Sequence, residues 1–227
     1  MSHATDFFKT RTMYKTCILL LLSLTLGAYT SIAQQYKPAS AEQKKEIQTK
    51  VAQASAHTNT LQSPFTQTKE LSVLSEIVTS QGMLYFKKQN NVRWQYNTPY
   101  SYVFILSNGK VTIINNNKSN TFDANSNKLF KKVSEIMIAS VNGTLLSNET
   151  EFASQYFVGA STVKVTLIPK DKELKKIMNT ITLTFSKTSW LVQTIQMVEQ
   201  GGDTTTIQFT QHNENKPISD DLFRSTK

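Results

Sequence analysis

The chain has 227 residues, and its formal net charge of +9 comes from 25 Lys and Arg residues against 16 Asp and Glu residues. This length suits one β-rich domain and does not require two. Such an excess of positive charge is compatible with binding to nucleic acid, to an anionic membrane surface or to acidic partners. No basic helix and no recognised nucleic-acid motif accompanies the charge, so we do not expect nucleic-acid binding.

Residues 1–33 have the organisation of a secretory signal peptide. A basic segment from Lys9 to Lys15 precedes an apolar run from Cys17 to Leu26, and the small residues Ser31 and Ala33 follow. The alternative is a membrane anchor, but the run is shorter than the roughly 20 apolar residues that span a bilayer. We therefore predict cleavage after Ala33, a domain over residues 34–227, and export to the periplasm.

The single cysteine, Cys17, lies inside the apolar run rather than directly after a small-residue cleavage site. This position argues against a lipid-bearing cysteine, which stays a weaker alternative, and it leaves the mature chain without disulfides. Cleavage removes Lys9, Arg11 and Lys15 against Asp6, which lowers the net charge by 2 to +7. We expect the remaining charge to favour transient contact with acidic membrane surfaces or acidic partners.

Two amphipathic helices are predicted. Ser40 and Gln43 form a capping box, and Ile47, Val51 and Ala54 follow at helical spacing. This first helix is either a core helix or a movable lid. A second helix is predicted from Asn125 or Ser126 to Ser140, and its apolar stripe, which fits either plain core or the roof of a cavity, comprises Leu129, Phe130, Val133, Ile136 and Met137.

The segment from Gly82 to Lys110 predicts a strand meander. Its aromatic and β-branched runs are Met83 to Phe86, Val92 to Tyr96 and Tyr102 to Leu106, and Asn108-Gly109 predicts a tight primed turn. Leu61 to Ser80 predicts two strands, or one long bent strand, before it. Alternation along the meander gathers large apolar groups and one cation on one face, namely Leu84, Phe86, Lys88, Val92, Trp94 and Tyr96.

The second half of the chain adds further strands, a charged segment at Lys170 to Lys176 that is a solvated turn or short helix, and a final helical turn within Ile218 to Arg224. The predicted strands are Val111 to Ile114, a short one at Thr121-Phe122, Phe152 to Val158, Val163 to Leu167, Thr180 to Phe185, Leu191 to Val198 and Thr205 to Thr210. About ten strands with two helices, without strand-helix alternation, predict one α+β domain built on a strongly curved antiparallel sheet.

No catalytic or metal-binding pattern is present in the sequence. His57 and His212 lack a second ligand at metal spacing, and the acidic pairs lie at predicted turns and ends. A nucleophile elbow is also missing. We therefore expect a protein that is not an enzyme and needs no cofactor.

The order of these motifs resembles the periplasmic outer-membrane lipoprotein carrier family (LolA-like). The resemblance rests on the Phe65-x-Gln67 start, the meander pattern from Gly82 to Pro99, the Ser107-Asn108-Gly109-Lys110 turn, and the closing Ile218 to Phe223 segment. It implies an open half-barrel whose concave apolar face is covered by helices and holds acyl chains. It also implies a periplasmic chaperone that ferries lipoproteins from an ATP-driven inner-membrane release complex to an outer-membrane receptor, as a monomer.

Carried over to this sequence, the resemblance makes Trp94 the cavity tryptophan, with Leu84, Phe86, Val92 and Tyr96 on the same face. From the second helix we add Phe130, Val133, Ile136 and Met137. Lys88 falls where members of the family place an arginine that holds the lid closed, and lysine lacks the guanidinium fork for bidentate contacts. The departure keeps two other functions open: a periplasmic carrier of another amphiphile, such as a glycolipid, phospholipid or polyene lipid, and a structural envelope protein with a filled core.

Overall fold

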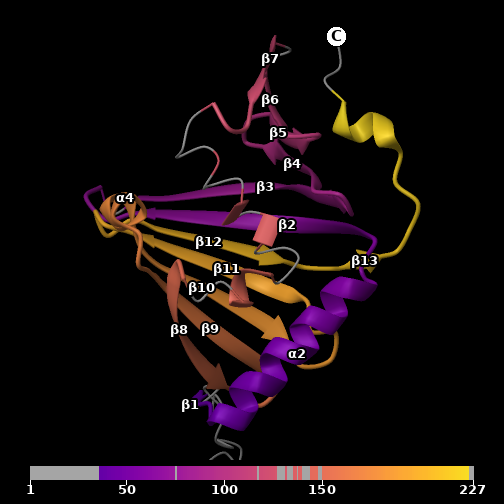
Figure 1. The fold of residues 1–227 in the computed structure, drawn as a ribbon. Coiled ribbons are helices and arrows are strands. Elements are labelled where there is room, and N and C mark those ends of the chain that lie inside the picture. Colours follow the sequence, from indigo (N-terminus) through magenta and orange to yellow (C-terminus); the bar gives the residue numbers. More distant parts are fainter. Residues whose placement is uncertain are drawn as a thin grey trace, which may run out of the picture. The chain divides into compact units, whose positions relative to one another are not determined.

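The computed structural model describes residues 36–74, 76–116, 118–126, 131, 135–136, 138–139, 144–147 and 150–224. The predicted signal peptide lies outside these residues. From Tyr36 onward the chain forms one compact unit built on a 13-stranded antiparallel open sheet (Figure 1). This architecture confirms the predicted curved antiparallel sheet and the half-barrel that the family resemblance implies.

The strands pair in the order β1-β8-β9-β10-β11-β12-β2-β3-β4-β5-β6-β7, and β13 also pairs with β2. Their bounds are β1 Lys37–Pro38, β2 Thr60–Leu71, β3 Glu76–Lys87, β4 Asn91–Thr98, β5 Tyr102–Ser107, β6 Lys110–Asn115, β7 Lys118–Asp123, β8 Phe152–Val158, β9 Thr162–Pro169, β10 Met178–Ser186, β11 Val192–Glu199, β12 Thr204–Phe209 and β13 Asn213–Glu214. The chain thus returns to the middle of the sheet when β12 pairs with β2.

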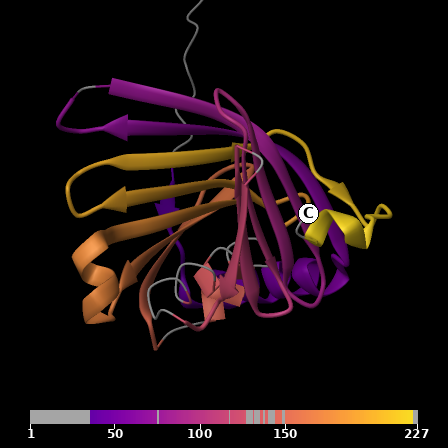
Figure 2. The same ribbon diagram turned by 90° about the horizontal axis from the view of Figure 1, so that it is seen from above.

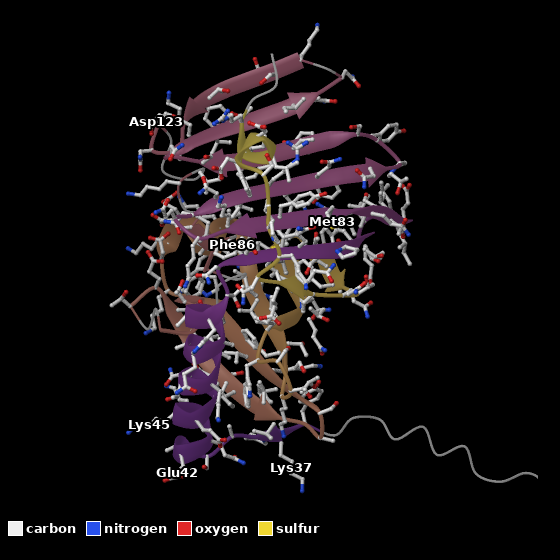
Figure 3. The ribbon with its side chains drawn as sticks, turned by 90° about the vertical axis from the view of Figure 1, so that its right-hand side faces the viewer. Lys37, Glu42, Lys45, Met83, Phe86 and Asp123 are labelled. Carbon is white, nitrogen blue, oxygen red and sulfur yellow. The ribbon has the colours of Figure 1, made fainter. Side chains whose placement is uncertain are left out.

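Helix α2 (Ala41–His57) lies across the concave side of the sheet (Figures 1 and 2). Ser40 caps it, and both bonds of the predicted capping box with Gln43 are present. Ile47 and Val51 are buried in the main core, whereas Glu42 and Lys45 are exposed on the helix (Figure 3). The helix therefore attaches through the narrow apolar stripe that the sequence predicts.

The meander has the predicted strands and turns. Asn108 and Gly109 adopt positive φ angles of 51° and 73°, as a primed hairpin turn requires. At the turn before β4, Gln89 and Asn90 have the positive φ angles, so this turn sits one residue earlier than Asn90-Asn91. The segment from Leu61 to Ser80 holds two strands rather than one bent strand, because β2 and β3 form a hairpin of two 12-residue strands. β3 continues to Lys87, so it also includes the predicted first strand of the meander, Met83 to Phe86.

Short elements complete the fold. The charged segment forms the short helix α4 (Lys172–Ile177), and the tail forms the 3-10 helix η2 (Asp220–Phe223). Strands β1 and β13 were not predicted, because two residues carry no periodicity and their pairing is decided by β8 and β2.

Most of the predicted second helix lies outside the described residues. Lys131, Glu135, Ile136, Ile138 and Ala139 are helical, and Ile136 belongs to the main core. The 3-10 helix η1 (Thr144–Ser147) follows and buries Leu146 in the same core.

The two faces of the sheet are covered differently. The concave face carries the main core beneath α2 and η1. The convex face carries a small cluster in which Phe223 of η2 packs on Val103 and Ile105 of β5. Arg93, on the convex side of β4, donates to the Leu222 carbonyl at 3.0 Å, and burial lowers the pKa of its guanidinium. The end of the chain thus covers the outside of the meander.

Candidate ligand-binding site

The residues predicted to form the acyl-chain site lie together on the concave face of β3 and β4. Leu84, Phe86, Val92 and Trp94 are buried in the main core, and Tyr96 packs against it half-buried. In Figure 3, Phe86 and Met83 mark the course of β3. From the second helix only Ile136 can be placed, and it packs in the same core. Phe130, Val133 and Met137 lie outside the described residues.

Five aromatic rings from four strands form a continuous group, called here the aromatic cluster. Phe65 of β2 lies 5.0 Å from Trp94 and 5.2 Å from Tyr96, measured between ring centroids. Phe209 of β12 lies 6.0 Å from Trp94, and Tyr102 of β5 lies 6.2 Å from Tyr96. Tilted and edge-on rings at such distances attract one another beyond their buried area.

Gly82 makes this cluster possible, because it lies on β3 between Phe65 and Tyr96 in the strand register. A β-carbon at Gly82 would stand 2.0 Å from the Gln95 carbonyl oxygen and 2.5 Å from the Phe65 ring. The pairing of β3 with β4 also shifts register between Gln81 and Gly82. A glycine at such an irregularity allows close approach of a neighbouring side chain, so the Phe65 ring passes over β3 to reach β4.

Polar groups accompany the aromatic rings. The Tyr96 hydroxyl donates to Oε1 of Gln67 at 2.8 Å, and burial raises the pKa of Tyr96 to about 12. The Trp94 indole lies close enough to that hydroxyl to oppose the rise in the pKa of Tyr96. The contact between the two groups nevertheless does not have the geometry of a hydrogen bond, so Nε1 of Trp94 is buried without a hydrogen-bond partner in the described part of the chain.

A second polar group lies beside Phe209. His212 Nε2 is 2.8 Å from the Val192 carbonyl, which can only accept, so Nε2 carries the proton and Nδ1 accepts from the Ser63 hydroxyl. Burial lowers the pKa of His212, and the Val192 carbonyl and Glu214 oppose this shift. Ser63 is fully buried. The pair therefore joins β2, β11 and the segment after β12, and we assign it no nucleophilic role.

The covering elements are tied to the sheet by a few polar bonds. Gln48 of α2 donates to the Tyr156 hydroxyl at 3.1 Å and to the Leu146 carbonyl at 3.4 Å. Tyr156 of β8 in turn donates to the same carbonyl at 3.3 Å. One side chain of α2 thus connects the helix, η1 and β8.

Lys88, the predicted lid latch, reaches the end of α2. Its Nζ donates to the Ala56 carbonyl at 2.6 Å, and its backbone N–H donates to the Asn59 carbonyl at 2.8 Å. The last carbonyls of a helix lack intrahelical partners, and a cation there also interacts favourably with the helix dipole. Lys88 therefore contacts the covering helix through one donor, while its role as a latch stays a prediction.

Sequence reasoning missed several members of this site. Phe65 and Gly82 were noted only as parts of a motif, and Phe209, Ser63 and Tyr102 were not assigned to the site. Phe65 and Phe209 alternate with exposed or half-buried neighbours on predicted strands, which is a usable signal for an inward face. No local sequence pattern shows which strands lie beside β4, so the sequence could not place Phe65 and Phe209 next to Trp94.

The model of the family described as outer membrane lipoprotein carrier protein LolA matches residues 56–226. The chain belongs to this family. A comparison with curated protein sequences finds no match.

Solved structures with a similar fold are distant in sequence from this LolA family member. A chain of the Pseudomonas aeruginosa MucA/MucB complex shares 14% identity at a TM-score of 0.48, over 81% of this chain and 61% of that one. This chain therefore spans about three fifths of that relative. A LolA superfamily protein from Nitrosomonas europaea shares 7% identity (TM-score 0.42; 80% and 97% covered). Lipoprotein LppX from Mycobacterium tuberculosis shares 14% (TM-score 0.45; 79% and 99% covered).

The described residues include no group of three His, Cys, Asp or Glu side chains placed to hold a metal ion. Among the same residues no helix has the length and apolar character needed to cross a bilayer.

Proposed function

We propose that this LolA family member is a periplasmic carrier that binds the acyl chains of lipoproteins on its concave face and ferries them from the inner to the outer membrane. The observation that supports it most directly is the aromatic cluster on the concave face of the open sheet, in a chain that matches the lipoprotein carrier family. Acyl chains offer only apolar area, so such a surface suffices to hold them.

The attachment of α2 is weak enough for exchange with cargo. Only Ile47 and Val51 of this helix are buried, and burial of two such side chains contributes about 1.5–3 kcal/mol each. An acyl chain of about ten methylenes gains about 8 kcal/mol when it leaves water. Cargo can therefore replace the apolar contacts of α2, which makes the helix the element that we expect to move.

The tip of the β2–β3 hairpin is the surface that we assign to transient membrane contact. Val73 and Leu74 are 88% and 65% exposed there, and Ile77 is 65% exposed. Ser72 bonds this tip to Gly201 and Asp203 of the β11–β12 turn. Exposed aliphatic side chains on a narrow protrusion can enter the boundary between headgroups and acyl chains.

Basic side chains lie at the same end of the sheet. The N–H of Gln200, in the β11–β12 turn, donates to the Ile177 carbonyl at the end of α4. On that helix Lys172 and Lys175 are exposed. They can meet anionic headgroups while the hairpin inserts.

The proposal includes no chemistry and no cofactor. An inner-membrane ATP-driven release complex would supply the cargo and an outer-membrane receptor would accept it, with the carrier acting as a monomer in the periplasm. Cargo of another class, such as a glycolipid, phospholipid or polyene lipid, is the outcome that would redirect the proposal.

Mass spectrometry of molecules that co-purify with the chain, taken gently from the periplasm, tests the cargo class. Acylated lipoproteins are the expected result, and free glycolipid or polyene lipid alone would replace the lipoprotein proposal. If a folded preparation carries neither class of molecule, the result favours a structural protein with a filled core.

Quenching by brominated acyl chains tests the site itself. The chain has two tryptophans, Trp94 and Trp190, so Trp190→Phe leaves Trp94 as the sole reporter and Trp94→Phe leaves Trp190. We expect strong quenching of Trp94 and much weaker quenching of Trp190. Equal quenching of both would place the acyl chain elsewhere.

A further inference from the structure

The indole N–H of Trp94 is a donor without an acceptor among the residues that the structure describes. Trp94 is only 4% exposed, and Nε1 is the one buried side-chain nitrogen or oxygen without a hydrogen-bond partner in the described residues. A buried donor without an acceptor is unfavourable, and phenylalanine would fill an apolar core without this cost. The donor therefore calls for an acceptor that the described residues do not provide.

The groups around the indole restrict what this acceptor can be. Phe65 and Phe209 flank the ring, at 5.0 and 6.0 Å between centroids, and offer no acceptor. The Tyr96 hydroxyl has Gln67 as its acceptor, and although the Trp94 indole is near enough to oppose the rise in its pKa, the two groups do not meet the geometry of a hydrogen bond. An oxygen that enters beside Trp94 would thus lie among aromatic rings and meet one neutral donor.

Such surroundings favour a neutral carbonyl over an anion. The aromatic cluster consists of Phe and Tyr side chains beside Trp94 and includes no cation to pair with a carboxylate or phosphate. The nearby His212 has a lowered pKa, which keeps it neutral. Arg93 lies on the convex side, where it bonds to Leu222. A charge buried without a partner is strongly unfavourable, whereas a carbonyl oxygen needs only one donor.

We propose that Trp94 Nε1 donates a hydrogen bond to the carbonyl oxygen of an ester- or amide-linked acyl chain, so that the site selects neutral acyl derivatives over free fatty acids and hydrocarbons. This inference rests on the proposed function, because it assigns the class of group that the acyl-chain site recognises. Trp94 then fixes how deep the cargo enters: the carbonyl stops at β4, and the methylenes extend along the apolar face.

The test compares three probes of equal chain length on the mature chain: methyl palmitate, palmitate and hexadecane, each competing with a fluorescent fatty-acyl probe. The ratio of ester affinity to alkane affinity should be about fivefold to tenfold higher in the wild type than in Trp94→Phe. This is the difference expected from one neutral hydrogen bond. The variant should be at least as stable to heat as the wild type. Trp190→Phe, the same substitution at the other tryptophan, should keep the preference.

A measurement on the wild type covers the case in which Trp94→Phe does not fold. The ¹⁵N-indole resonance of Trp94, told apart from that of Trp190 with Trp190→Phe, should shift downfield with methyl palmitate and stay in place with hexadecane. Equal shifts with both probes, or an ester preference that survives in Trp94→Phe, would overturn the inference and leave the carrier function standing. Failure of the wild type to bind any probe would overturn the proposed function as well.

Discussion

Strands β9 and β10 contribute mostly aliphatic side chains to the concave core, with Phe185 as the aromatic exception. Strands β2, β4 and β12 instead bring Phe65, Trp94, Tyr96 and Phe209 together beside aliphatic residues such as Leu61 and Val92. Val165, Leu167, Ile181 and Leu183 are each 0% exposed and carry no polar atom. The aromatic cluster instead includes the unpartnered indole N–H of Trp94 and two tyrosine hydroxyls, with the Ser63–His212 pair beside it.

This difference separates a permanent core from an exchangeable one. Interdigitated aliphatic chains at full burial reach crystal-like density and lose much when disturbed. The aromatic cluster has a buried polar atom without a partner, the indole N–H of Trp94, and a ligand can supply the missing hydrogen bond. We infer that the β9–β10 side keeps the sheet folded while the β2–β4 side exchanges its contacts with cargo.

The largest effect is expected from Leu183→Ala on the aliphatic side. Truncation of a fully buried leucine removes its transfer free energy and leaves a cavity, so the free energy of unfolding should fall by about 3–5 kcal/mol. Urea denaturation measures it, and the ester-over-alkane preference should be unchanged in the folded fraction. A loss below about 1 kcal/mol would show that this side is not the rigid part.

Gly82→Ala should have the next largest effect, because its β-carbon would meet the Gln95 carbonyl and the Phe65 ring. Overpacking of this kind costs about 1–3 kcal/mol, and the near-UV circular dichroism of the aromatic cluster should change with it. Gly201→Ala is the matched control, since a β-carbon there meets open space. If the two variants are equally stable, Gly82 does not shape the cluster.

Lys88→Met should lower stability by about 1 kcal/mol or less, because it removes an exposed bond to the Ala56 carbonyl. The change should be local: faster amide hydrogen exchange near the end of α2 and tighter cargo binding, since the cover opens more readily. Lys110→Met on β6, also an exposed lysine, is the control and should change neither. Slower exchange at α2 or weaker binding would contradict the latch role.

The smallest effect concerns pH and His212. Burial lowers its pKa below the ordinary value of 6.5, so between the two values the unfolded chain binds more protons than the folded one. The contribution of this group is therefore complete above about pH 6.5 and is lost as pH falls through the lowered value. His212→Gln should flatten the decline of stability as the pH falls below about 6.5, measured by urea denaturation. An unchanged slope would show that the Ser63–His212 pair is not pH-sensitive.

Local patterns alone determined most of the elements. The Ser40–Gln43 capping box, the Asn108-Gly109 turn and the alternation of Leu84 with Phe86 each act within a few residues, so the sequence predicts them directly. The same alternation placed Val92 and Trp94 on the face that the structure buries. The motif order was also sufficient to indicate the family.

Tertiary structure decided the rest, because the remaining contacts join segments that are distant in the chain. Ser63 meets His212 across 149 residues, and Phe209 reaches Trp94 because β12 pairs with β2. The register that places Gly82 opposite both Phe65 and Tyr96 lets the aromatic cluster form. Strand pairing and register are properties of the whole sheet, and the unpartnered donor of Trp94 becomes visible only when every neighbour of the indole is in place.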